Sequence, residues 1–152
     1  MIAETVESGG IPVVGVATVG GVLWHTVGLR EAGHPEIALP VAGTSINWAS
    51  SLLATAASAA INTGVMPIGK AMATEGRTHR YRLFPIEHSV ASTHLSIAAR
   101  RWNEVAERSG VDPMVDRFAA VQMALVDGED RLPHEPGHSF AGQMTLYAAH
   151  PN

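Results

Sequence analysis

The stretch Trp24–Glu36, WHTVGLREAGHPE, decides how the chain is organised. It contains the end of an apolar run, a break at Gly28, a charged turn and a His-Pro-Glu sequence that opens a second apolar run. This pattern predicts two short strands joined by a turn. Because polar side chains stand beside apolar strands here, the stretch is also the first candidate for a functional site.

The segments on either side of this stretch predict a β-rich domain. Gly20-Gly21 supplies the positive-φ positions of a hairpin turn, so the runs before and after it are expected to pair antiparallel. Apolar runs bounded by Gly, Pro or polar clusters predict the strands Pro12–Thr18, Val22–Leu29, Pro35–Val41, Val65–Ala73, His79–Ile86, Phe118–Val126 and Gln143–Ala149. Phe118–Val126 is apolar almost throughout, which is typical of a central strand.

Two segments have the spacing of helices. Thr44–Thr63 and Ser89–Ser109 repeat apolar residues every three to four positions and are followed by Gly64 and Gly110. We therefore expect a single α+β domain over 1–152, with a mostly antiparallel, strongly curved or barrel-like sheet and two main helices. Residues 1–10 are expected to form a frayed or weakly paired start.

Composition limits the function classes. The chain has 152 residues, no cysteine and a net charge of −4, with 16% charged residues. The lack of cysteine removes thiolate chemistry, and the lack of basic runs argues against nucleic acid as a partner. The first ten residues do not resemble a signal peptide, so a cytoplasmic location is expected.

Residues 37–69 contain no charged side chain but are rich in Ser, Thr and Asn. Such a segment is too polar for a bilayer span, so no membrane association is expected. The small side chains along one face of the 44–63 helix predict a contact surface, and we expect a homodimer formed through it.

A second polar stretch, Asp127–His138, contains the letters HEPGH at 134–138. Two histidines with this spacing bind zinc when they lie one turn apart on a helix. Pro136 and Gly137 disfavour that helix, so a zinc protease is not expected. A metal shared by His134 and His138 in a tight turn stays open, beside the alternative of an ordinary turn.

Both stretches carry a resemblance to a known family. The segments TVGL at 26–29, HPE at 34–36 and VQMALVDGEDRLPHEPG at 121–137 resemble, in order and spacing, the bacterial domain of unknown function numbered 4262. A further family segment, Pro-Val-Asp-like, is matched by Pro85-Ile86-Glu87. The resemblance covers most of residues 13–145 and implies no activity.

The sequence departs from the family pattern at two positions. His25 stands where the family has tyrosine, and His134 stands where it has tryptophan. Replacing two aromatic side chains by imidazoles is consistent with proton-transfer or metal chemistry, and equally with drift in a divergent member.

Two hypotheses for function follow. The first is a small enzyme or small-molecule-binding domain, whose site forms where segments 25–36 and 127–138 converge. Histidine and a neighbouring carboxylate would supply acid–base chemistry, and arginine would hold an anionic group. The candidate residues are His25, His34, Glu36, His134 and Glu135 as catalytic groups, and Thr26, Asp130 and Arg131 as ligand-binding groups.

Metal, haem or flavin assistance is open, because the sequence names no cofactor. The second hypothesis is a non-catalytic interaction or immunity-type protein that acts through the uncharged 44–63 helix.

Overall fold

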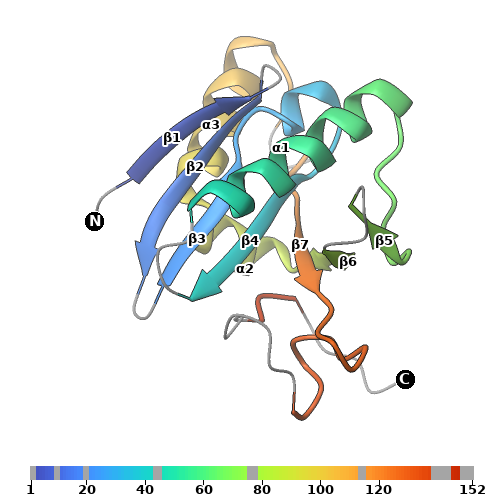
Figure 1. The fold of residues 1–152 in the computed structure, drawn as a ribbon. Coiled ribbons are helices and arrows are strands. Elements are labelled where there is room, and N and C mark those ends of the chain that lie inside the picture. Colours follow the sequence, from blue (N-terminus) through green and yellow to red (C-terminus); the bar gives the residue numbers. More distant parts are fainter. Residues whose placement is uncertain are drawn as a thin grey trace.

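The structure is a computed structural model that describes residues 3–8, 11–18, 21–42, 46–74, 79–112, 116–137 and 145–147. Its strands form one open, curved sheet in the order β1-β2-β3-β4-β7-β6-β5 (Figure 1). All neighbours pair antiparallel except β4 and β7, which run parallel. The strands are β1 (Ala3–Ser8), β2 (Ile11–Thr18), β3 (Gly21–Thr26), β4 (Glu36–Ala42), β5 (Met72–Ala73), β6 (Arg80–Ile86) and β7 (Ala120–Leu125). The prediction of an α+β fold with a mostly antiparallel sheet is confirmed.

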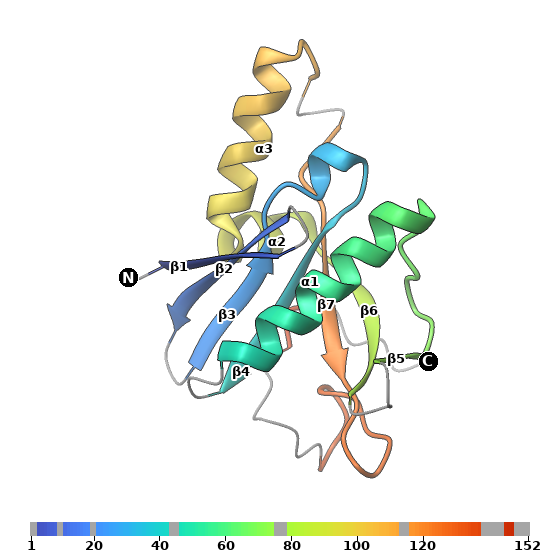
Figure 2. The ribbon, with the colours of Figure 1, turned by 45° about the horizontal axis from the view of Figure 1, so that its top comes forward.

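Helices cover both faces of the sheet. Helix α1 (Ile46–Thr63) lies across one face, and α2 (His88–His94) and α3 (Ser96–Arg108) lie on the other (Figure 2). Each interface has its own apolar core, one containing Trp24 and Leu53 under α1, the other containing Leu23 and Trp102 under α3. Strands between two helical layers are buried on both faces, which explains why every residue of β7 is buried.

The first predicted helix forms almost as expected, since α1 begins at Ile46 and ends at Thr63. The second is divided into α2 and α3 at Leu95, which has φ −107° and ψ 47° and is fully buried. Just before the break, the Thr93 hydroxyl donates to the Ser89 carbonyl at 2.8 Å. Such a side-chain bond often bends a helix. No helix in the described part of the chain is long and apolar enough to cross a membrane.

Several strand boundaries differ from the prediction. Of Val65–Ala73, only Met72–Ala73 pairs as a strand, because Pro67 lacks an amide donor and Gly64 and Gly69 have φ values of 75° and 77°. Strand β3 ends at Thr26, before the turn at Gly28 with φ 110°.

At the two ends of the chain, the start at 1–10 contains the edge strand β1 over Ala3–Ser8. The described part of Gln143–Ala149, residues 145–147, has no strand, and the rest lies outside the described residues.

Candidate functional site

The first polar stretch forms a turn around the buried carboxylate of Glu36, which is 1% exposed. This carboxylate accepts four hydrogen bonds, from the Thr26 hydroxyl at 2.8 Å and from the backbone N–H groups of Gly28 at 2.9 Å, Leu29 at 3.0 Å and Arg30 at 3.1 Å. The Thr26 hydroxyl oxygen also accepts from the Ile37 N–H at 2.9 Å. Because all four donors belong to the protein, the Glu36 carboxylate is fully hydrogen-bonded within it.

The electrostatics of Glu36 reflect this position. Burial raises the pKa of the Glu36 carboxyl above its ordinary value, and the hydrogen bonds from Arg30, Thr26, Gly28 and Leu29 oppose that rise. Both carboxylate oxygens of Glu36 accept hydrogen bonds from groups in or next to the turn between β3 and β4. The carboxylate therefore shapes this turn and has no accessible oxygen with which to contact a ligand.

His25 is fully buried in β3, on the sheet face that α3 covers. Its Nδ1 lies 3.0 Å from the Thr26 carbonyl oxygen, and its Nε2 has no partner among the described residues. Because only a protonated Nδ1 can donate to a carbonyl, the proton of the neutral ring sits there. Burial lowers the pKa of His25, and the hydrogen bond to Thr26 only partly opposes this. His25 is thus a neutral core histidine.

His34 lies half-buried at the end of the same turn, and its backbone N–H donates to the Leu29 carbonyl at 3.1 Å. The first stretch thus contributes one buried histidine, one buried carboxylate and one histidine at the molecular surface.

The two polar stretches do not converge. Because β4 and β7 run parallel, Glu36 pairs with Ala120 at the start of β7. Asp127 comes seven residues later, about 23 Å away along an extended chain. In both views the turn with the 3-10 helix at Arg30–Ala32 lies at one end of the sheet and residues 127–137 at the other (Figures 1 and 2). The prediction of one site shared by 25–36 and 127–138 was therefore wrong.

The second stretch is built around Asp127, which is 2% exposed. Its carboxylate accepts from the backbone N–H groups of Glu129 at 2.9 Å and Arg131 at 2.8 Å, and from the Arg131 Nε at 2.9 Å. The Arg131 guanidinium also packs over Gly137, where a Cβ atom would lie 2.6 Å from Nη1. Arg131, a predicted ligand-binding residue, is thus engaged in holding the loop.

The HEPGH segment does not form a helix, since residues 133–137 are turns and a bend. His138 lies outside the described residues, so the pairing of His134 with His138 on a metal stays a prediction. Among the described residues, no group of three or more His, Cys, Asp or Glu side chains could hold a metal ion.

His134 instead contacts an aromatic cluster. Its Nδ1 lies 2.7 Å from the Tyr147 hydroxyl, and its ring meets the Phe84 ring edge to face. Burial raises the pKa of Tyr147 to about 12, a rise that a backbone hydrogen bond from His134 opposes and the charge of Glu135 reinforces. The phenol therefore keeps its proton, and its hydroxyl and the His134 Nδ1 share one hydrogen bond.

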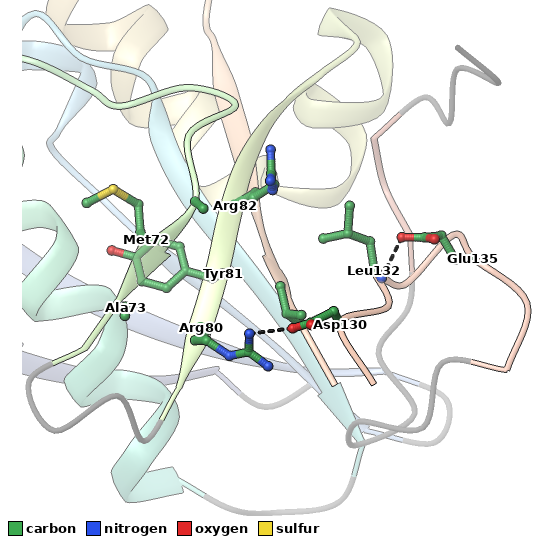
Figure 3. Close-up of a pocket in the computed structure, with 10 residues that line it drawn as sticks. Met72, Ala73, Arg80, Tyr81, Arg82, Asp130, Leu132 and Glu135 are labelled. Carbon is green, nitrogen blue, oxygen red and sulfur yellow. Dashed lines mark hydrogen bonds and ion pairs between the residues drawn. The ribbon is translucent and has the colours of Figure 1, made fainter. Parts of the chain in front are cut away.

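Next to this cluster lies a cavity of about 500 Å³ between β5, β6 and the loop that follows β7 (Figure 3). Its lining residues are Ala71, Met72, Ala73, Arg80, Tyr81, Arg82, Val126, Asp130, Leu132 and Glu135. Of the predicted site residues, Asp130 and Glu135 line the cavity, and His134 is the neighbour of Glu135 in the chain. His25, Thr26, His34 and Glu36 are at the other end of the sheet.

The charged side chains in the cavity differ in how many partners they have within the protein. Arg80 forms an ion pair with Asp130 and donates to the Asp127 carbonyl at 3.4 Å. Within the described part of the chain, the Arg82 guanidinium makes one hydrogen bond, from Nη1 to the Gly69 carbonyl at 3.0 Å. Glu135 accepts the Leu132 N–H at 2.9 Å through Oε1. Arg82 and Glu135 therefore keep polar atoms that a bound molecule could use.

Sequence reasoning did not select Arg80, Arg82, Tyr81 or Met72 as site residues. The signal was present in the alternation of 79–87, where Arg80, Arg82 and Phe84 fall on one face of the strand. What the sequence did not reveal is that the loop after β7 folds against this face.

Comparison with known proteins identifies the family. Searches of the curated proteins and of the solved structures gave no match to this chain. The family described as "Domain of unknown function (DUF4262)" matches residues 5–139, which include both polar stretches and every residue that lines the cavity. The chain therefore belongs to the DUF4262 family.

Proposed function

We propose that the protein is a small-molecule-binding domain whose ligand occupies the cavity between β5, β6 and residues 126–135. The observation that supports this is the cavity itself, whose volume of about 500 Å³ lies in the range typical of small-molecule sites. Its lining mixes apolar side chains with charged groups, as such sites commonly do.

Acid–base chemistry at this cavity would fall to two of the predicted catalytic residues. Glu135 lines the cavity, and its neighbour His134 is exposed, with Nδ1 engaged by Tyr147. In this proposal the Nε2 of His134 is the ring nitrogen that exchanges protons with solvent or with a bound molecule. A cytoplasmic location is part of the proposal, supported by the absence of cysteine.

Filling the cavity tests the proposal. A thermal-shift screen of small metabolites, followed by calorimetric titration of the hits, identifies ligands of the purified protein. Ala73→Phe places a large side chain in the cavity from the exposed strand β5, where aromatic residues are well tolerated. We expect at least tenfold weaker binding for this variant.

Ala17→Phe, at an exposed position of β2, is the matched control and should bind as the wild type does. Equal affinity of Ala73→Phe and the wild type for every hit would place the binding site elsewhere and overturn the proposal.

A second candidate, homodimerisation through α1, is favoured by the face of this helix that points away from the sheet. That face carries exposed Ser51, Thr55 and Ala59, and it continues into Ile61, Val65 and Ile68, which are 42%, 58% and 46% exposed. Adjacent exposed apolar side chains often mark a contact surface. Sedimentation should then give twice the 16.0 kDa chain mass, and Thr55→Glu should return the mass to that of one chain. A wild-type mass of one chain at micromolar concentration would refute this candidate.

A further inference from the structure

We infer that the ligand of this cavity is a small zwitterion with a carboxylate that binds Arg82 and an ammonium group that binds Glu135, as in a free amino acid. The inference rests on the proposed function, since it names the ligand class of the same cavity. It comes from comparing which charges in the cavity are already neutralised within the protein and which are not.

The first pair of charges is satisfied internally. The Arg80 guanidinium forms its ion pair with Asp130 and also donates to the Asp127 carbonyl, so both of these partners come from the loop after β7. Figure 3 shows Arg80 and Asp130 facing each other along one side of the cavity. This pair fixes the loop against β6 and leaves little net charge for a ligand.

The second pair of charges is not satisfied in this way. No ion pair of Arg82 or of Glu135 is present among the described residues, and each side chain makes a single hydrogen bond to a backbone group. Four of the five N–H donors of a guanidinium and one carboxylate oxygen thus stay available. Both residues are half-buried, so a ligand that covers them must replace the hydrogen bonds to water that the two side chains lose.

Charge complementarity selects the ligand class. A purely anionic ligand would satisfy Arg82 but would bring a like charge close to Glu135, and a purely cationic ligand would have the reverse fault. A molecule with one group of each sign satisfies both at once. Sites built to bind polar groups strongly reject analogues that lack them, because the protein groups are then buried unpaired.

The remaining lining is suited to a short apolar part. Ala71, Ala73, Val126 and Leu132 contribute small aliphatic surfaces, and Leu132 stands beside Glu135 in Figure 3. Such a surface accommodates the side chain of an aliphatic amino acid better than a second charged group.

The experiment uses the twenty standard amino acids as probes in calorimetric titrations of the full chain. For each amino acid that binds, the amide derivative lacks the carboxylate charge, and the N-acetyl derivative lacks the ammonium charge. We expect at least one free amino acid to bind and both of its derivatives to bind at least tenfold more weakly.

Two variants assign each charge to its residue. Arg82→Met should weaken the free amino acid at least tenfold while leaving the affinity of the amide unchanged. Glu135→Gln should weaken binding of the free amino acid and leave the affinity for the N-acetyl derivative unchanged. Arg100→Met and Glu107→Gln, both on the exposed surface of α3, are matched controls that should bind as the wild type does.

The outcomes separate this inference from the proposal on which it rests. If no free amino acid binds, or if a hit keeps its affinity as the amide or N-acetyl derivative, the zwitterion inference is overturned. If other small molecules then bind and Ala73→Phe abolishes their binding, the cavity remains a binding site. If Ala73→Phe binds every hit as tightly as the wild type does, both the proposed binding cavity and the zwitterion inference are refuted.

Discussion

Replacing Glu36 by alanine should destabilise the protein strongly without touching the proposed ligand site. The side chain is 1% exposed and accepts four hydrogen bonds that hold the turn between β3 and β4. The sequence alone suggested a catalytic role, in which Glu36→Gln would abolish activity with little change in melting temperature. The structure predicts the opposite pattern.

The magnitude follows from the donors that Glu36→Ala leaves behind. The Thr26 hydroxyl and the Leu29 N–H make buried bonds to the carboxylate, whereas those of Gly28 and Arg30 are only partly buried and can bind water. A buried donor without a partner costs about 1–3 kcal/mol, so the two buried donors together cost about 2–6 kcal/mol. Removing a buried charge offsets part of this, and the cavity left by the side chain adds to it. We expect a loss of about 3–5 kcal/mol, which is a large part of the stability of an ordinary domain.

Urea unfolding followed by circular dichroism measures this loss. Glu36→Gln keeps one acceptor oxygen and should lose roughly half as much as Glu36→Ala, by the same count of donors. Glu104→Ala, on the exposed surface of α3, is the control and should change stability by no more than about 0.5 kcal/mol. A Glu36→Ala protein within about 1 kcal/mol of the wild type would refute the structural role derived from the four hydrogen bonds.

Three further predictions test other parts of the fold. Because the folded-state pKa of His25 is depressed below its ordinary value of 6.5, the stability that its neutral ring provides is fully present above about pH 6.5 and is lost as the pH falls towards the folded-state pKa. His25→Phe should flatten the fall of unfolding free energy below that pH, and the exposed His94→Gln should leave the slope unchanged. Gly15→Ala should cost about 1–3 kcal/mol in urea unfolding, since its Cβ would lie 2.8 Å from the buried ring of Trp24; unaltered stability would show that the ring can move. Asp127→Asn should weaken three hydrogen bonds and speed amide exchange at Glu129 and Arg131, whereas unchanged protection there would contradict its role in holding the loop.

Local patterns in the sequence predicted the main elements well. The spacing of apolar residues placed α1 within two residues of its start, and the almost continuous apolar run placed β7 in the interior of the sheet. The hairpin of β2 and β3 followed from the paired glycines, and Thr18 indeed pairs with Gly21. These features depend on residues close together in the chain, so they can be derived without the tertiary structure.

The position of the site depended on a feature that local patterns do not contain. The His-Pro-Glu sequence stands at the start of β4, and Asp127 stands after the end of β7. An antiparallel pair of these strands would have brought the two together, whereas the parallel pair that forms sets them at opposite ends. The direction of a single strand pairing, made between residues more than eighty positions apart, therefore decided where the polar groups lie.

The two polar stretches use the same chemistry at opposite ends of the sheet. In each, a buried carboxylate accepts backbone N–H groups and fixes a turn: Glu36 between β3 and β4, and Asp127 after β7. A carboxylate engaged in this way is unavailable to a ligand, so the density of polar residues in a sequence does not by itself identify a functional site. More informative are the charged side chains that a rigid turn holds in place but that do not themselves form the hydrogen bonds of the turn. The Asp127 turn carries Glu135 into the lining of the cavity that Arg82 also lines, and the turn around Glu36 presents no comparable pair among the described residues. The site is therefore expected at the end of the sheet where the scaffold leaves charges unpaired.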